Sequence, residues 1–246
     1  MKIKYLFLIT MISFSFFKCS ANNENSYQGT GNQKIEPKSS VQLENFSKAY
    51  FASGCFWCVE AIFESVRGVE EAISGYAGGK ESNPTYRQVS GGRTSHAEAV
   101  EVYYDSSVVS YETLVQVFYG SHNPTTVNGQ HPDYGPQYRS MIYYQNEAEK
   151  KIAENFKAAL DASGKYDKPI ATEIVPFIKF WVAEDYHQNY EKRNPNKPYI
   201  RNVSIPRLNK FLAKFPELLK ETELKSSKSF SFGTDQCEQN PGIILF

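Results

Sequence analysis

Between residues 48 and 177, apolar runs with the two-residue period of strands alternate with segments whose apolar residues recur at helical spacing. Gly68 stands where a glycine favours the end of a helix, and Asn146 with Glu149 forms a capping box. Strands and helices in the order β-α-β-β-α-β predict an α+β fold, a two-layer sandwich with a split βαβ core. Helices are expected at 56–67, 111–122 and 146–165, and strands at 48–53, 70–78, 96–105, 138–145 and 171–177.

The chain is long enough to bury a sizeable core, with 246 residues of which 41% are apolar and 15% are aromatic. Composition predicts one domain at 46–224, preceded by a flexible linker at 19–45 that is rich in Asn, Ser, Gly and Gln. An irregular tail is expected at 225–246. The formal net charge of +0 argues against nucleic acid as the main partner.

Residues 1–18 have the features of an export signal, because Lys2 and Lys4 precede an apolar run, 5–17, that is too short to span a bilayer. Cys19 resembles the lipid-attachment cysteine of bacterial lipoproteins, although Lys18 replaces the small residue usual before it. We therefore expect an exported protein of the periplasm or cell envelope, with a membrane tether through Cys19. Simple cleavage nearby, or a start that is never processed, is the alternative.

Two cysteines, Cys55 and Cys58, stand at the start of the first predicted helix. Gly54 lets the strand turn sharply, so Cys55 falls at the helix N-terminus, where free N–H groups and the dipole lower the pKa of a thiol. The pair could exchange disulfides, form half of a metal site, or supply one nucleophile, and Cys55 could also be a small buried residue without function. A zinc site needs a second ligand pair, and the sequence has no second C-x-x-C and no H-x-x-x-H, so we expect no metal.

Glu98 lies in the predicted strand 96–105 and shares one face with Val100, Val102 and Tyr104. Burial without a cation raises the pKa of a carboxyl and keeps it protonated, as a proton donor requires near neutral pH. The alternative is a glutamate on an edge strand whose carboxylate reaches solvent.

Two polar loops punctuated by Gly and Pro carry three further candidates, Tyr86 in one loop and Asp133 with Tyr138 in the other. Taken alone, tyrosines in loops usually pack against neighbours or line a rim. Six motifs set these residues in a wider pattern: GCFWCVE, GYAGG, NPTYRQV, HAEAVEV, GPQYRS and AEDYHQNY, in this order over about 54–190.

In these motifs the sequence resembles the A-type peptide methionine sulfoxide reductases. The resemblance implies a ferredoxin-like α+β sandwich and reduction of the S epimer of methionine sulfoxide, free or in proteins. It implies that Cys55 is the nucleophile, that Glu98 is the acid, and that Tyr86 and Tyr138 bind the sulfoxide oxygen. It further implies that Phe56 and Trp57 form an apolar wall for the S-methyl group, and that Asp133 shapes the same pocket.

The expected reaction leaves a sulfenic acid on Cys55, which a second thiol must resolve. Many members of the family have glycine where this chain has Cys58, and carry resolving cysteines in a glycine-rich tail. Cys58 lies one helical turn from Cys55, so we expect it to be the resolving thiol, with Cys237 as second choice. Cys58 could instead be an unreactive core residue.

The family also implies a monomer without a bound cofactor that is recycled by an external, thioredoxin-like thiol reductant. The sequence alone leaves two other classes of function open. One is a thioredoxin-like disulfide exchanger that uses Cys55 and Cys58, and the other is a non-catalytic surface lipoprotein on a reductase-like scaffold.

Overall fold

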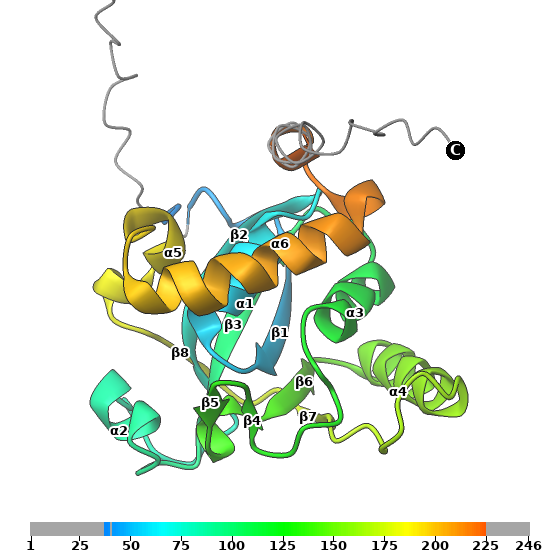
Figure 1. Ribbon diagram of the computed structural model, residues 1–246, viewed down its shortest axis with the longest axis horizontal. Helices are drawn as coiled ribbons and strands as arrows, with labels where there is room; N and C mark the ends of the chain where they lie inside the picture. The colour runs from blue at the N-terminus through cyan, green and yellow to red at the C-terminus, as the bar shows by residue number, and fades with distance from the viewer. Residues whose placement is uncertain (1–36, 40, 225–246) are drawn as a thin grey trace, which may run out of the picture. The chain divides into compact units, whose positions relative to one another are not determined.

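The computed structural model describes residues 37–39 and 41–224, and within this part of the chain six strands form one mixed sheet (Figure 1). The strands of this sheet are β1 (Ser47–Ser53), β2 (Val69–Ala77), β3 (Ala97–Tyr104), β6 (Ser140–Tyr144), β7 (Glu173–Pro176) and β8 (Phe180–Val182). Their order is β7-β6-β1-β3-β2-β8, and neighbours pair antiparallel except β6 and β7. A small hairpin, β4 (Gly129–Gln130) and β5 (Asp133–Tyr134), stands apart. The mixed α+β fold expected from the sequence is confirmed.

The α-helices labelled in Figure 1 are α1 (Phe56–Glu64), α2 (Tyr86–Ser90), α3 (Tyr111–Gly120), α4 (Glu147–Ala162), α5 (Tyr190–Arg193) and α6 (Ile205–Lys214). Helix α1 packs on β2 and β3, and α6 crosses over α1 (Figure 1). A π-helical turn, Ile200–Ser204, leads directly into α6. Helix α1, which has Cys55 at its N-cap and Cys58 in its first turn, therefore lies between the sheet and α6.

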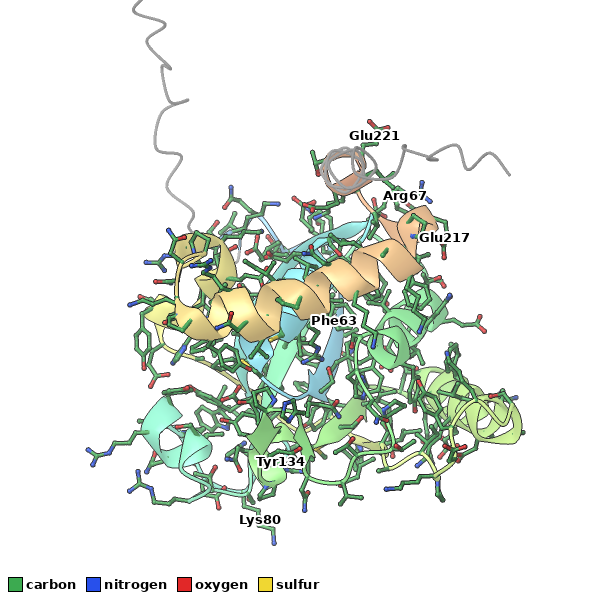
Figure 2. The ribbon with its side chains drawn as sticks, viewed as in Figure 1. Phe63, Arg67, Lys80, Tyr134, Glu217 and Glu221 are labelled. Carbon is green, nitrogen blue, oxygen red and sulfur yellow. The ribbon has the colours of Figure 1, made fainter. Side chains whose placement is uncertain are left out.

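Three phenylalanines join the sheet to its helices. The ring of Phe51 on β1 stacks on Phe63 of α1 at 5.0 Å and on Phe118 of α3 at 5.5 Å between centroids. Each is fully buried, and Phe63 lies near the centre of the fold (Figure 2). Burying an aromatic side chain of this size stabilises a fold by about 1.5–3 kcal/mol, so this stack anchors α1 against β1.

Helix α1 ends at Glu64, three residues earlier than predicted. The reason is tertiary, since Val66 pairs with Leu219 in an isolated bridge and the Arg67 N–H donates to the Leu218 carbonyl at 2.8 Å. Gly68 (φ 87°) serves the turn into β2 instead of the helix end.

Helix α4 begins as predicted, with the Asn146 side chain accepting from the Glu149 N–H at 3.0 Å. The second half of the capping box differs. The Glu149 carboxylate accepts from the Gln145 N–H at 2.7 Å, one residue before the expected donor. The helix start is therefore held by an Asn cap and a neighbouring acidic side chain.

Several expectations concern residues outside the described part of the chain: the export signal at 1–18, Cys19, most of the linker, the tail at 225–246 and Cys237. Residues 41–45, at the end of the expected linker, form turns, and Leu43 is buried against Ile73 and Tyr103. Of the helices that the structure describes, none combines the length and the apolar composition needed to cross a membrane.

Replacing Phe63 with alanine tests the anchor between α1 and β1. We expect the free energy of unfolding in urea to fall by about 3–5 kcal/mol, because the change removes a buried ring and leaves a cavity. The matched control is Ile178→Ala, at a side chain that is 88% exposed, which should change stability by less than about 0.5 kcal/mol. Equal effects of the two substitutions would contradict this description of the core.

Candidate active site

The turn between β1 and α1 sets the position of the first thiol. Gly54 has φ 94°, and a Cβ atom there would lie 2.9 Å from the Cβ of Gln130, so glycine is required on both counts. Cys55 is the N-cap residue of α1, and Cys58 lies in its first turn. Both cysteines are free and buried, with 5% and 1% of their surface exposed.

The predicted lowering of the pKa of Cys55 is wrong. Burial raises the pKa of this thiol well above its usual value, and the charges of Cys58 and Glu98 raise it further. The helix terminus does not offset this, because the Phe56 N–H, the first donor of α1, is taken by the Glu98 carboxyl at 3.0 Å. The pKa of a helix N-cap cysteine therefore depends here on its neighbours more than on the dipole.

Cys58 behaves in the opposite way. A hydrogen bond from Cys55 lowers its pKa against the effect of burial, and the Arg207 charge, Ser204 and Tyr199 lower it further. Of the two thiols, Cys58 is therefore the one whose surroundings favour the thiolate. Tyr199 also faces the pair, with its hydroxyl 4.0 Å from the sulfur of Cys58.

Glu98 has the environment that the sequence predicts. It lies on β3, only 2% exposed, on the face that carries Val100 and Val102 into the helix-covered core. Burial raises its pKa to about 8, and the charges of Asp133 and Cys58 act in the same direction, against the Phe56 N–H. The carboxyl is therefore protonated at neutral pH, and the expectation of a buried neutral acid is confirmed.

Aromatic rings gather at the start of α1. Phe56 is fully buried and stacks on Tyr86 at 6.1 Å, and Trp57 stacks on the same ring at 6.3 Å. Burial raises the pKa of both Tyr86 and Tyr138, and the charges of Glu98 and Cys55 contribute to each shift. Both phenols are therefore neutral donors close to the acid and the thiol. Neither hydroxyl bonds to another described residue, so both are available to a ligand.

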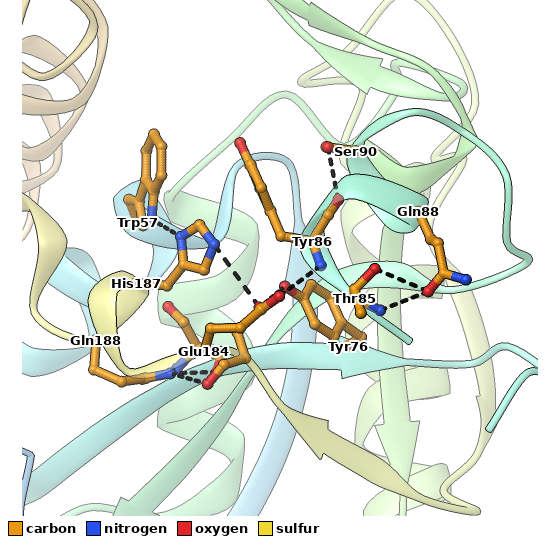
Figure 3. A network of polar contacts seen from close by, with 11 residues as sticks. Trp57, Tyr76, Thr85, Tyr86, Gln88, Ser90, Glu184, His187 and Gln188 are labelled. Carbon is orange, nitrogen blue, oxygen red and sulfur yellow. Dashed lines mark hydrogen bonds and ion pairs between the residues drawn. The ribbon is translucent and has the colours of Figure 1, made fainter. Parts of the chain in front are cut away.

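Trp57 is held by residues far along the chain (Figure 3). Its indole N–H donates to Nδ1 of His187 at 3.1 Å, and its ring stacks on Tyr190 at 3.9 Å. Because Nδ1 accepts, the neutral His187 carries its proton on Nε2, and burial lowers its pKa to about 4. The sequence motif AEDYHQNY thus supplies a packing and hydrogen-bonding element for the aromatic wall.

Glu184 of the same motif fixes the position of Tyr86 (Figure 3). Its carboxylate accepts from the Tyr86 N–H at 3.0 Å and from the Tyr76 hydroxyl at 2.8 Å, and it lies 3.9 Å from Nε2 of His187. Sequence reasoning did not single out Glu184, because only the fold brings it to the start of α2.

Tyr199 is the principal site residue that sequence reasoning missed. Its hydroxyl donates to Oδ2 of Asp133 at 2.5 Å, and its ring meets Trp57 edge-on at 5.8 Å. Asp133, Tyr199 and Arg207 also line a cavity of about 600 Å³. The feature of the sequence that could have indicated Tyr199 as a site residue is its position shortly after the AEDYHQNY motif.

The structure thus brings together every predicted site residue that it describes. Among the described residues, no group of three or more His, Cys, Asp or Glu side chains is arranged to hold a metal ion. The residues that meet at the start of α1 are Cys55, Phe56, Trp57, Cys58, Tyr86, Glu98, Asp133 and Tyr138.

An α+β fold with two buried thiols, a neutral carboxyl and an aromatic wall defines a site of the oxidoreductase class. The sequence model of the family described as “Peptide methionine sulfoxide reductase” matches residues 47–218 of this chain. The chain therefore belongs to the peptide methionine sulfoxide reductase family, and it is an enzyme.

Curated relatives carry the name of the A type. Peptide methionine sulfoxide reductase MsrA 1 of Rhodopirellula baltica is 48% identical over 173 residues, covering 70% of this chain and 88% of that protein. MsrA of Pasteurella multocida is 46% identical over 173 residues, covering 70% and 98%.

Solved structures agree in fold. Mxr1 from Saccharomyces cerevisiae in its reduced form matches with a TM-score of 0.59 and 32% identity, covering 67% of this chain and 92% of that one. Methionine sulfoxide reductase A of Corynebacterium diphtheriae matches with a TM-score of 0.55 and 37% identity, covering 61% and 76%.

The raised pKa of Glu98 makes stability depend on pH. The folded carboxyl, with a pKa of about 8, holds its proton where an unfolded one, with a pKa near 4.5, has lost it. The stability it contributes is present below pH 4.5 and is lost as the pH rises through 8. Relative to Glu98→Gln, we expect the free energy of unfolding to fall by about 2–4 kcal/mol between pH 5 and pH 8.

Urea unfolding at several pH values measures this difference. Glu154→Gln, at an exposed carboxyl on α4, is the control and should follow the unmodified protein throughout. A difference between the protein and Glu98→Gln that stays constant with pH would show that Glu98 is ionised in the folded state.

Proposed function

We propose that the chain reduces the S epimer of methionine sulfoxide, free or in proteins, through attack by Cys55, and so repairs oxidised proteins. The observation that carries this proposal is the neutral carboxyl of Glu98 next to the Cys55 thiol. A sulfoxide sulfur is a poor electrophile until its oxygen takes a proton, so a thiol needs such an acid beside it. The preference for the S epimer rests on the family alone.

In the proposed first step, one oxygen atom and two protons are transferred between the substrate and the site residues. Glu98 gives its proton to the sulfoxide oxygen while Cys55 gives its thiol proton to the Cys58 thiolate. The oxygen moves from the substrate sulfur to the Cys55 sulfur. Methionine leaves reduced, Cys55 is oxidised to a sulfenic acid, and Glu98 is left as a carboxylate.

Other site residues bind the substrate in this proposal. The neutral hydroxyls of Tyr86 and Tyr138 donate to the sulfoxide oxygen as negative charge develops on it. The rings of Phe56 and Trp57 hold the S-methyl group, which is the apolar handle beside the reacting sulfur. Asp133, fixed by its bond from Tyr199, shapes the same pocket.

Cys58 is the resolving thiol in this proposal. It attacks the Cys55 sulfur, the S–O bond breaks, and the leaving hydroxide takes a proton to depart as water. What supports this role is the position of Cys58 in the first turn of α1, just after Cys55 at its N-cap, and the lowered pKa of Cys58, since the thiolate is the nucleophile. Cys237, the second choice, lies outside the described residues.

The disulfide that results must be reduced from outside. We propose a thioredoxin-like dithiol protein as the reductant, since exchange with a dithiol returns both cysteines to thiols and needs no bound cofactor. We also propose that the enzyme acts as a monomer.

The export signal at 1–18 and Cys19 support a further part of the proposal, an enzyme of the periplasm or cell envelope with a lipid anchor. Labelling of cells with radioactive palmitate tests it: the full chain should take up label and Cys19→Ala should not. An unprocessed, unlabelled protein in the cytoplasmic fraction would contradict both export and anchoring.

We propose that β6, β1, β3 and β2 form a ferredoxin-like core. What supports this is their antiparallel order, β6-β1-β3-β2, with α1 between β1 and β2 and with α3 between β3 and β6. These are the connections of a split βαβ unit.

Disulfide exchange is the second candidate function, because the lowered pKa of Cys58 favours it as well. The Glu98→Gln variant distinguishes sulfoxide reduction from disulfide exchange. We expect the rate of methionine release to fall about 10²–10⁴-fold, because a positioned general acid contributes that much. In the unmodified enzyme this rate should decline above about pH 8, where Glu98 loses its proton. Methionine is measured by chromatography, with Glu154→Gln as the control.

Three outcomes would contradict the proposal. If Cys55→Ser still released methionine, Cys55 would not be the nucleophile. If Glu98→Gln released methionine within about threefold of the normal rate, Glu98 would not be the acid. Disulfide exchange without any methionine release would favour the exchanger.

A further inference from the structure

The cavity that Asp133 lines has a volume of about 600 Å³ and is rich in positive charge. Four cationic side chains line it: Lys165, Arg207, Lys210 and Lys214. Among the described residues that line it, Asp133 is the one acid. Four cations against one acid leave this cavity strongly positive, and we call it the basic cavity.

The basic cavity reaches the proposed active site at one end. Tyr199 lines it, donates a hydrogen bond to Asp133, and has its hydroxyl 4.0 Å from the sulfur of Cys58. Arg207 lines it as well, and Nη1 of this side chain would lie 3.4 Å from a Cβ atom at Gly54, in the turn that precedes the first thiol. A ligand in the basic cavity therefore lies next to the pocket of the proposed reaction.

The cations follow α6 away from this end, along the helix that crosses over α1 (Figure 1). Arg207, Lys210 and Lys214 lie on one face of α6, because they are spaced by three and four residues. From Arg207 to Lys214 the helix rises by about 10 Å, which an extended peptide spans in about three residues. Lys165, which follows α4, adds its charge near Lys214.

Acids of the chain do not neutralise these cations. The three lysines are exposed, and none of them forms an ion pair with an acid in the described part of the chain. Arg207 donates to two backbone carbonyls, at 2.8 and 2.9 Å. Burial and the charges of Lys165 and Lys210 lower the pKa of Lys214, so like charges repel one another along the cavity. An anionic ligand would relieve this repulsion.

A protein substrate supplies such a ligand at the right place. Methionine sulfoxide within a protein has polypeptide on both sides, and this polypeptide must continue over the neighbouring surface when the sulfur lies at Cys55. The basic cavity begins at Asp133, which shapes the substrate pocket in the proposed function. A row of cations about 10 Å long matches carboxylates spread over several residues better than it matches one small anion.

We propose that the basic cavity binds an acidic segment of polypeptide that flanks methionine sulfoxide, so that oxidised methionines next to Asp or Glu are reduced preferentially. The inference rests on the proposed function and names the class of protein substrate. Lys165, Lys210 and Lys214 determine specificity in this proposal and take no part in the chemistry at Cys55. Their effect therefore falls on KM more than on kcat.

The test is to measure kcat and KM of the full chain at low salt, with dithiothreitol as reductant, for short peptides that contain methionine sulfoxide. Asp, Asn or Lys residues, about three in each peptide, precede the sulfoxide in one set and follow it in a second set. In one set or both we expect kcat/KM of the Asp peptide to exceed that of the Asn peptide about 5–10-fold, and the Lys peptide to be the poorest. High salt should reduce these differences, because it screens exposed charges.

Lys210→Glu tests the cavity itself, because it reverses the charge of an exposed side chain that lines it. We expect the ratio of kcat/KM between the Asp and Asn peptides to fall at least about threefold, through KM. Lys151→Glu is the matched control, at an exposed lysine of α4 that does not line the cavity, and it should keep the normal ratio.

Equal kcat/KM for the Asp and Asn peptides in both sets, or an equal effect of Lys151→Glu and Lys210→Glu, would overturn the acidic docking and leave the proposed function standing. If Lys210→Glu raised KM for a thioredoxin-like reductant and kept the peptide ratio, the cavity would serve the reductant and the proposal would be wrong. Absence of methionine release from every peptide and from free methionine sulfoxide would overturn the proposed function and this inference together.

Discussion

The hydrogen bond from the Phe56 amide to the Glu98 carboxyl is the contact on which the rest of the site depends. It joins the first N–H of α1 to the middle of the sheet at 3.0 Å, and so fixes Cys55 beside the acid. The bond alone would favour an ionised carboxyl, but burial is the larger effect and keeps Glu98 protonated. The same environment raises the pKa of Cys55. An acid and a thiol are therefore both held in their neutral forms, close to one another.

A buried site tolerates little net charge, and this limits where the proton of each thiol can go. Within the thiol pair the thiolate is favoured at Cys58, near Arg207 and the Tyr199 hydroxyl. In the proposed cycle, Cys58 accepts the proton of Cys55 and must release it again before it attacks the Cys55 sulfur. The proton that Cys58 takes up during substrate reduction is thus the one that it gives up when the disulfide forms.

The sequence predicts the elements that depend on local pattern and misses what depends on distant contacts. Strand alternation placed Glu98 on the buried face, because period and burial are coupled along one strand. Tyr199 and His187 were not recognised as site residues from spacing, since their partners Cys58 and Trp57 lie 141 and 130 positions away. The pKa of Cys55 was predicted in the wrong direction, because the helix start was visible in the sequence and the neighbours that bury it were not.

The most direct measurement is the mass of the purified chain after one turnover with racemic methionine sulfoxide and no reductant, with peptide mapping of any disulfide. We expect one methionine per chain, consumption of the S epimer alone, and a bridge between Cys55 and Cys58. Methionine release with a bridge from Cys55 to Cys237, or with a persistent sulfenic acid, would contradict the role of Cys58. A bridge formed without any methionine would contradict the account as a whole.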